Sequence, residues 1–215
     1  MKFSAIIFDF GGVVTTSPFD TFNRLEAERG LPKDFIRSII AVDRDNNAWA
    51  KFERAEMSAD EFDAAFEVEA KARGVDLRGA DVIKCLSGDV RPHVVAAMDR
   101  LKADGFRLGC ITNNVPSGEG PGMAHGLGKA EQVADALTRF EVIIESSKVG
   151  VRKPDLRIYE MMCERLGVAA TECVYLDDLG INCKPAAALG MHAIKVSGET
   201  QLLADLLAVT GVVFD

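Results

Sequence analysis

The stretch FSAIIFDFGGVV, residues 3–14, decides the fold class of this chain. Residues 3–8 form a run rich in apolar and β-branched side chains, which indicates a buried strand. Asp9 follows this run directly, and Gly11 and Gly12 come soon after it. In open parallel sheets, ligands bind beyond the carboxyl ends of the strands. The stretch therefore predicts a strand that ends in a ligand-binding turn.

Four more runs of the same kind follow, and helical patterns separate them. We expect strands at residues 107–111, 141–144, 173–176 and 192–196. We expect helices that open at Arg91-Pro92, at Lys153-Pro154 and near Asn182, and that stop at Gly105, Gly167 and Gly190. Strands alternating with helices predict an α/β fold with a doubly wound parallel sheet.

Residues 17–86 break this alternation. They contain no convincing strand, and apolar residues recur at helical spacing, as at Phe62, Ala65 and Phe66. Ser58 with Glu61 three residues later resembles a capping box. We interpret the segment as an inserted helical bundle, with helices that merely cover one sheet face as the alternative. The expected domains are an α/β core of residues 1–16 and 87–215 and a helical cap of residues 17–86.

Composition excludes several functional classes. The 215 residues are 48% hydrophobic, too apolar for a disordered chain, and the net charge of −8 argues against nonspecific nucleic-acid binding. No apolar run approaches the roughly 20 residues of a membrane helix. The five cysteines include no CxxC pair, which favours reduced thiols. We expect a cytoplasmic protein without nucleic-acid or membrane partners, and the oligomeric state stays open.

Polar residues follow the expected strands. Thr112-Asn113 ends the second strand, Asp177-Asp178 the fourth, and Lys153 follows the third strand and its loop. Each alone could be a turn former, a helix cap or a solvated side chain. The adjacent carboxylates of Asp177 and Asp178 repel each other unless a cation or hydrogen bonds stabilise them. Because these residues and Asp9 should meet at one sheet edge, they indicate an active site.

These residues resemble the four motifs of the haloacid dehalogenase-like hydrolase superfamily, and residues 17–86 occupy the position of its helical cap. Residues 147–155, together with 175–178, are similar to the N-terminal phosphatase domain of soluble epoxide hydrolases and to bacterial sugar-phosphate phosphatases. The resemblance implies a Rossmann-like core. It also implies a Mg²⁺-dependent phosphomonoester hydrolase acting on a small phosphorylated metabolite.

The resemblance also implies roles for single residues. Asp9 would attack phosphorus and form an aspartyl-phosphate, and Lys153 would offset negative charge. The phosphate-binding residues would be Gly11, Gly12, Thr112, Asn113 and Lys153. The Mg²⁺ ligands would be Asp9, the Gly11 carbonyl, Asp177 and Asp178. Asn182 would either stabilise the acidic loop or cap the following helix.

Gly11 departs from the family pattern. Most phosphatases of the superfamily have a second aspartate there, which acts as general acid and base and is commonly worth about 10²–10⁴ in rate. Three explanations remain. The chain could be a phosphatase for leaving groups that need little protonation, or one in which water or a cap residue is the acid. It could be a haloacid or phosphonate hydrolase, or a non-catalytic or weakly active phosphate-binding protein. Retention of Asp9, Lys153 and the acidic pair favours the phosphatase.

Two further residues have open roles. His125 lies in a glycine-rich loop between residues 113 and 128 and could contact substrate. Trp49 could face the substrate cleft, although packing is the favoured role. Nothing in residues 17–86 identifies the substrate. We expect the cap to close over the site, with hinges near residues 15–17 and 86–89.

Overall fold

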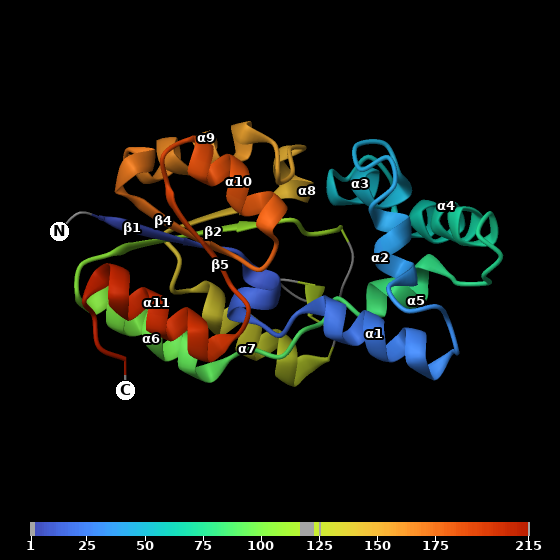
Figure 1. Ribbon diagram of the computed structural model, residues 1–215, viewed down its shortest axis with the longest axis horizontal. Helices are drawn as coiled ribbons and strands as arrows, with labels where there is room; N and C mark the ends of the chain where they lie inside the picture. Colours follow the sequence, from blue (N-terminus) through green and yellow to red (C-terminus); the bar gives the residue numbers. More distant parts are fainter. Residues whose placement is uncertain (1–2, 117–122, 125, 215) are drawn as a thin grey trace.

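The computed structural model of the chain describes residues 3–116, 123–124 and 126–214. A five-stranded parallel sheet lies at its centre, in the order β3-β2-β1-β4-β5 (Figure 1). The strands are β1 (Ala5–Phe8), β2 (Arg107–Thr112), β3 (Val142–Glu145), β4 (Cys173–Asp177) and β5 (His192–Lys195). The expected strands are confirmed within two residues, because each is an apolar run buried between helices.

Helices cover both faces of this sheet. One face carries α6 (Pro92–Ala103), α7 (Leu127–Leu137) and α11 (Glu199–Thr210), and the other carries α8 (Ser146–Val149), α9 (Leu156–Leu166) and α10 (Gly180–Ala188) (Figure 1). Successive residues of β1 point to opposite faces. Ile6 and Phe8 pack with the first helix group, and Ala5 and Ile7 with the second. The doubly wound α/β fold is confirmed.

The ends of the helices differ slightly from the sequence prediction. The helix expected to open at Lys153-Pro154 begins at Leu156, because Asp155 is its N-cap and accepts a hydrogen bond from the Arg157 N–H at 2.9 Å. Lys153 therefore lies in the turn before α9. In the described part of the chain, none of the helices has the length and hydrophobicity that crossing a membrane requires.

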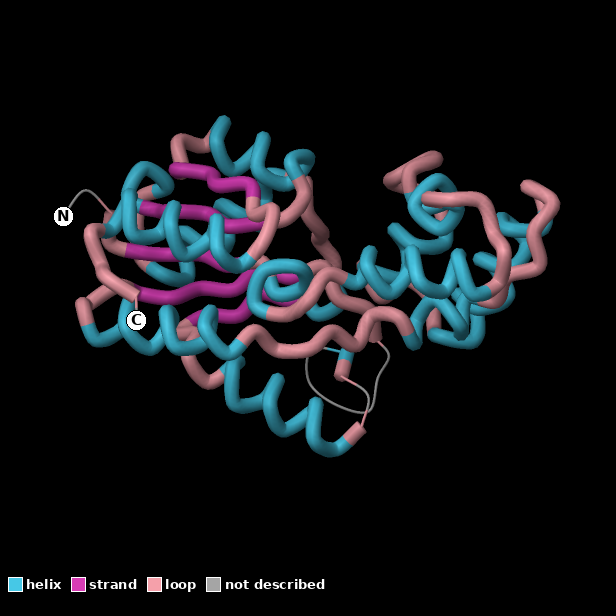
Figure 2. Tube along the Cα trace, turned by 60° about the horizontal axis from the view of Figure 1, so that its bottom comes forward, coloured by secondary structure: helices cyan, strands magenta, loops and turns pink. Residues whose placement is uncertain are grey.

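Residues 17–86, which we call the helical insertion, form a separate group of helices without a strand (Figures 1 and 2). They are α1 (Pro18–Glu28), α2 (Phe35–Ile40), α3 (Ala48–Glu53), α4 (Ala59–Lys71) and α5 (Gly79–Lys84). The capping box is confirmed, with the Glu61 N–H 3.3 Å from Ser58 Oγ and the Ser58 N–H 2.7 Å from Glu61 Oε2. These helices bury their own apolar cluster and do not lie on a sheet face.

The insertion joins the sheet through two linkers that run side by side. Thr15 and Val90 form an antiparallel bridge. The Thr16 N–H donates to the Asp89 carbonyl at 2.8 Å, and the Arg91 N–H donates to the Val14 carbonyl at 2.9 Å. Both covalent connections therefore leave the core at one place.

Candidate active site

The turn after β1 is shaped by Asp9 and two glycines. Asp9 Oδ1 accepts a hydrogen bond from the Phe10 N–H at 2.6 Å and caps the short π-helical turn η1 (Phe10–Val14). Gly12 has φ 80°, and a Cβ there would lie 2.2 Å from Asp178 Oδ2, so this position requires glycine. Gly11 has φ −68°, and a Cβ would lie 3.7 Å from Pro18 Cδ, which is an ordinary contact. A Cβ therefore fits at position 11.

Lys153 is the central cation of the site. It is 1% exposed, and its Nζ lies 2.8 Å from Asp9 Oδ1 and 2.8 Å from Asp177 Oδ2. Burial lowers the pKa of Lys153, but Asp177 and Asp9 raise it by more, so the ammonium stays charged. Lys153 is thus not a solvated surface lysine.

The nucleophile candidate, Asp9, is also buried. Burial raises the pKa of Asp9 well above its usual range, Lys153 opposes this shift, and Asp177 and Asp178 add to it. Its other oxygen, Oδ2, accepts no hydrogen bond from the described residues. Asp9 therefore presents one oxygen to Lys153 and keeps one for a ligand or reactant.

The carboxylate of Asp177 is held by protein donors. Its Oδ1 accepts from the Leu179 N–H at 2.8 Å, and its Oδ2 accepts from Tyr175 Oη at 2.6 Å and from Lys153. Asn182 Nδ2 lies 3.1 Å from both oxygens. The residue at the N-cap of α10 is Leu179, so Asn182 stabilises the acidic loop and does not cap the helix.

Asp178 follows Asp177 at the same edge of the sheet. Its Oδ2 accepts a hydrogen bond from Ser17 Oγ at 3.2 Å, and burial, followed by the charge of Asp177, raises its pKa to about 6. One oxygen each of Asp9, Asp177 and Asp178 lie within 4.8 Å of one another. Three hard carboxylate oxygens at this spacing fit a magnesium ion.

Thr112 and Asn113 complete the polar edge at the end of β2. Thr112 is 7% exposed. The Asn113 side chain binds the backbone of Lys153 in both directions: Oδ1 accepts from the Lys153 N–H at 2.8 Å, and Nδ2 donates to the Lys153 carbonyl at 3.0 Å. Sequence reasoning assigned Asn113 to phosphate binding alone. The side chain has the further task of fixing the turn that carries Lys153.

Glu53 is a site residue that sequence reasoning missed. It ends α3, is 6% exposed, and its Oε2 lies 2.6 Å from Arg152 Nε. Ser146 Oγ donates to the Glu53 carbonyl at 2.7 Å, and Asn113 Nδ2 lies 3.5 Å from Oε2. The only signal in the sequence was the position of Arg152 beside Lys153, since nothing marks Glu53 among the acidic residues of the insertion. Glu53 ties the insertion to the core beside the site.

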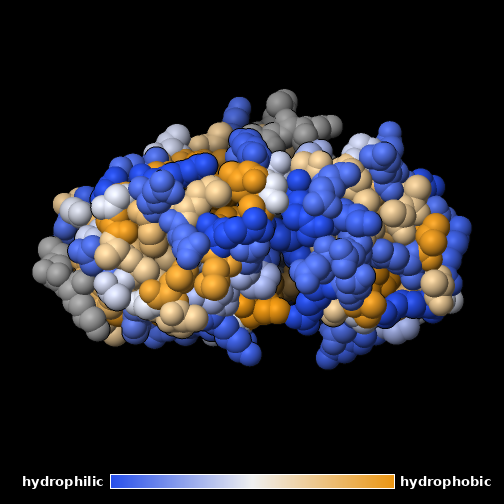
Figure 3. Space-filling view, turned by 90° about the horizontal axis from the view of Figure 1, so that it is seen from above, coloured by the Kyte–Doolittle hydropathy of each residue, from blue (hydrophilic) through white to orange (hydrophobic). Residues whose placement is uncertain are grey.

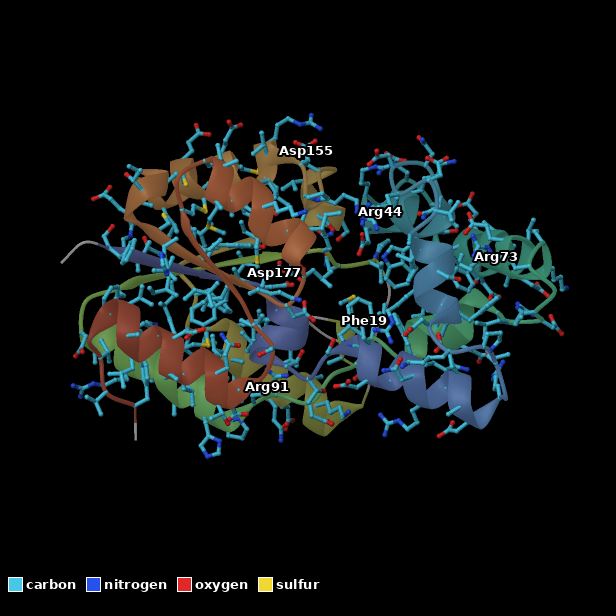
Figure 4. All side chains as sticks on the ribbon, in the orientation of Figure 1. Phe19, Arg44, Arg73, Arg91, Asp155 and Asp177 are labelled. Carbon is cyan, nitrogen blue, oxygen red and sulfur yellow. The ribbon has the colours of Figure 1, made fainter. Side chains whose placement is uncertain are left out.

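A cavity of about 510 Å³ lies between the insertion and the core. Figure 3 shows the surface hollowed there, and in Figure 4 Phe19 and Arg44 lie on the insertion side and Asp177 on the core side. Six of the expected site residues line this cavity: Asp9, Gly11, Thr112, Asn113, Lys153 and Asp178. Gly12 and Asp177 do not line the cavity: Asp177 accepts a hydrogen bond from Lys153, and the absence of a side chain at Gly12 leaves room for Asp178.

Of the two residues with open roles, Trp49 is described. It is 8% exposed, lines the cavity, and packs edge-on against Phe22 and Phe62, with ring centroids 6.2 and 5.8 Å away. Trp49 therefore combines the packing role with a place in the cavity wall. His125 lies outside the described residues.

Known proteins are similar to this chain in sequence or in fold. The chain is 28% identical to bifunctional epoxide hydrolase 2 of Sus scrofa over 99% of its own length, but spans only 40% of that protein. It is 28% identical to phosphatase MT3486 of Mycobacterium tuberculosis, covering 94% of this chain and 91% of the relative. The solved HAD family enzyme bt-2542 of Bacteroides thetaiotaomicron, in complex with magnesium and inorganic phosphate, has a TM-score of 0.61. It is 16% identical, and the alignment covers 92% of this chain and 96% of that one.

A family model gives the assignment. The model described as haloacid dehalogenase-like hydrolase matches residues 3–190. The matched part contains β1 to β4, the whole helical insertion and every candidate site residue. This chain therefore belongs to the haloacid dehalogenase-like hydrolases.

Proposed function

We propose that the chain is a Mg²⁺-dependent phosphomonoester hydrolase that acts on a small phosphorylated metabolite. The observation that carries this proposal is the buried ammonium of Lys153, 2.8 Å from both Asp9 and Asp177, at the floor of a cavity. A fixed cation beside a carboxylate nucleophile is suited to a dianionic phosphate, because it offsets the repulsion between them. A binding module would have no need for the nucleophile.

The proposed reaction has two steps, in which the phosphoryl group is transferred first to Asp9 and then to water. The carboxylate of Asp9 attacks phosphorus, the P–O bond to the alcohol breaks, and the leaving oxygen takes a proton. Water then hydrolyses the aspartyl-phosphate, which releases inorganic phosphate and restores Asp9. The Thr112 hydroxyl, the Asn113 amide and the turn at Gly11 and Gly12 bind phosphoryl oxygens in this scheme.

The acidic residues fit the proposed magnesium ion. Asp9, the Gly11 carbonyl and Asp178 would hold it, and the bound ion would offset charge on the phosphoryl group. Asp177 lies within reach of the same ion, but its oxygens already accept from Lys153, Tyr175, Leu179 and Asn182. We therefore propose that Asp177 mainly orients Lys153 and that Asp178 is the carboxylate available to bind the magnesium ion.

Because position 11 is a glycine, the proton for the leaving oxygen must come from another group. The insertion contributes one buried carboxylate to the cavity, Glu53. Burial raises the pKa of Glu53 and Arg152 opposes this shift only in part, but Glu53 Oε2 is engaged by Arg152 Nε at 2.6 Å and is not free to face a leaving group. We therefore propose leaving groups that need little protonation, with water as the proton source. Haloacid hydrolysis is less well supported, since it needs no metal and would leave the acidic cluster without a use.

The helical insertion acts as a cap in this proposal. Residues 17–86 cover the cavity, and the paired linkers at Thr15 and Val90 would serve as its hinge. Substrate would enter when the insertion moves away, and water would be excluded when the Glu53–Arg152 ion pair forms.

Hydrolysis of p-nitrophenyl phosphate and acetyl phosphate with and without Mg²⁺ tests the proposal. We expect turnover that requires the metal and is abolished by Asp9→Asn, while the melting temperature stays near that of the wild type. Full activity of a normally folded Asp9→Asn variant would refute the covalent mechanism. No hydrolysis of either compound at any Mg²⁺ concentration would refute the phosphatase.

A further inference from the structure

The insertion side of the cavity is mainly apolar. Its lining residues there include Phe19, Phe22, Ile40, Trp49 and Leu86. Phe19 and Ile40 are only partly buried, so their apolar surfaces remain accessible from the cavity. A ligand that reaches from Asp9 toward the insertion therefore meets aromatic and aliphatic side chains.

The charged groups on this side are paired or exposed to solvent. Arg37 forms an ion pair with Asp34, and its guanidinium lies over the Phe19 ring, 5.2 Å from the centroid. Glu53 is paired with Arg152. Two further charged lining residues, Arg44 and Asp45, are exposed, and Figure 4 shows Arg44 on the side of the insertion that faces the core. Arg37 Nε is a buried donor without a hydrogen-bond partner among the described residues, but the other charged groups are paired or exposed, so the buried part of this wall offers few groups to the hydroxyls of a sugar.

The core side adds an apolar edge to the same cavity. Ile181, in the first turn of α10, is 38% exposed and lines the cavity together with Leu179 and Pro154. Large apolar side chains that face a cavity with an apolar opposite wall are typical of a binding site for an apolar group. Both walls beyond the charged floor therefore have the same chemical character.

We infer that the substrate is the monophosphate of a hydroxyl compound with a largely apolar body whose oxygen leaves readily, such as a phenol or an enol, and not a sugar phosphate. This inference rests on the proposed phosphatase function. Each methylene that the cavity removes from water should strengthen binding about fourfold. A polyhydroxyl body would instead lose its water hydrogen bonds against this wall without replacing them.

Inhibition by n-alkyl phosphonates tests this inference independently of leaving-group chemistry. Ethyl, butyl, hexyl and octyl phosphonate are measured as competitive inhibitors of acetyl phosphate hydrolysis, a substrate with almost no body. We expect the inhibition constant to fall about fourfold per methylene until the chain reaches solvent. We also expect octyl phosphate to have a higher kcat/KM than hexose phosphates esterified at a primary hydroxyl. Both are esters of primary alcohols with similar leaving groups, so the difference would report the fit of the body to the apolar wall.

Variants in the wall provide a second readout. Ile40→Thr and Ile181→Thr should each weaken octyl phosphonate binding about fivefold and change the KM for acetyl phosphate much less, because acetyl phosphate has almost no apolar body to contact them. Val68→Thr is the matched control, since Val68 is 68% exposed on α4 and does not line the cavity. Because Ile181 is itself exposed, its replacement tests binding without a folding defect.

The outcomes separate the two proposals. Inhibition constants that do not change with chain length, or a preference for hexose phosphates, would overturn the apolar substrate while acetyl phosphate turnover upheld the phosphatase. No hydrolysis of either acetyl phosphate or p-nitrophenyl phosphate at any Mg²⁺ concentration would refute the phosphatase, and with it the inference that depends on it.

Discussion

The floor of the cavity and its insertion wall are built on opposite physical principles. The floor buries charges that hold one another, with Lys153 between Asp9 and Asp177. The wall buries aromatic rings that pack on one another, such as Phe22 and Trp49, which meet edge-on with centroids 6.2 Å apart. Charges need fixed partners, so the floor tolerates few substitutions. Apolar packing depends mainly on volume, so substitutions in the wall can alter which substrate binds without affecting the catalytic residues of the floor.

The largest effect should come from removing the cation of the floor. Lys153→Met leaves Asp9 and Asp177 buried without their shared partner, and we expect a loss of about 3–5 kcal/mol in the free energy of unfolding and more than about 10³-fold in kcat/KM. Urea unfolding and p-nitrophenyl phosphate kinetics measure both. Lys148→Met is the control, because the Lys148 side chain is 73% exposed and its ion pair with Glu145 is worth at most about 1 kcal/mol. Equal losses of stability in Lys153→Met and Lys148→Met would show that the buried ion pairs of Lys153 matter no more to stability than a surface ion pair.

The next effect concerns protonation of the Asp178 carboxylate in the metal-free protein. Asp178 has a pKa of about 6 in the folded chain against an ordinary 3.8, so the folded state binds its proton more tightly than the unfolded state. The stabilisation that this proton provides is complete below about pH 4 and is lost as the pH rises to 6.

Asp178→Asn should therefore be more stable than the wild type above pH 6, by up to about 3 kcal/mol, and equal to it near pH 4. Urea unfolding in EDTA at both pH values measures the difference. Saturating Mg²⁺ should reverse the order at pH 7, because the ion stabilises only the carboxylate. A difference that is constant with pH would show that Asp178 is not the titrating group.

A smaller effect tests the missing aspartate. A Cβ fits at Gly11 and the backbone there has a negative φ, so we expect Gly11→Asp to fold and to raise kcat/KM for alkyl phosphates by about 10–100-fold, with little change for aryl or acyl phosphates. Gly12→Ala is the steric control, since its Cβ would clash with Asp178 at a left-handed backbone position, and we expect it to be destabilised. A uniform change across the three substrate classes would show that protonation of the leaving group does not limit turnover.

The smallest effect concerns the contact between the two regions. Glu53→Gln removes the ion pair with Arg152 but keeps the shape of the side chain, and we expect a loss of about 1–2 kcal/mol in stability and a severalfold higher KM. Glu56→Gln is the matched control, because the Glu56 side chain is 49% exposed and pairs with Arg54 at the surface. If both variants bind substrate like the wild type, Glu53 does not couple the insertion to the site.

Much of the fold and of the floor could be predicted because the relevant signals are local. Apolar runs of four to six residues became β1 to β5, and the residues after them, Asp9, Thr112 and Asp178, reached one edge because parallel strands all end there. The capping box at Ser58 was equally local. Helix starts were less accurate where a side-chain cap decided them, as Asp155 does for α9.

The sequence by itself thus determined the family, the alternation of strands and helices, and the group of residues at the floor. Only the tertiary structure decided which of these residues does what. Asp177 accepts hydrogen bonds from four protein donors, whereas Asp178 faces the cavity. Glycine is required at position 12 and not at position 11. The tertiary structure also decided that Glu53 meets Arg152, 99 residues away in the chain. The physical reason is that strand and helix signals act between neighbours in sequence, whereas partners, burial and cavity walls depend on segments that meet only after folding.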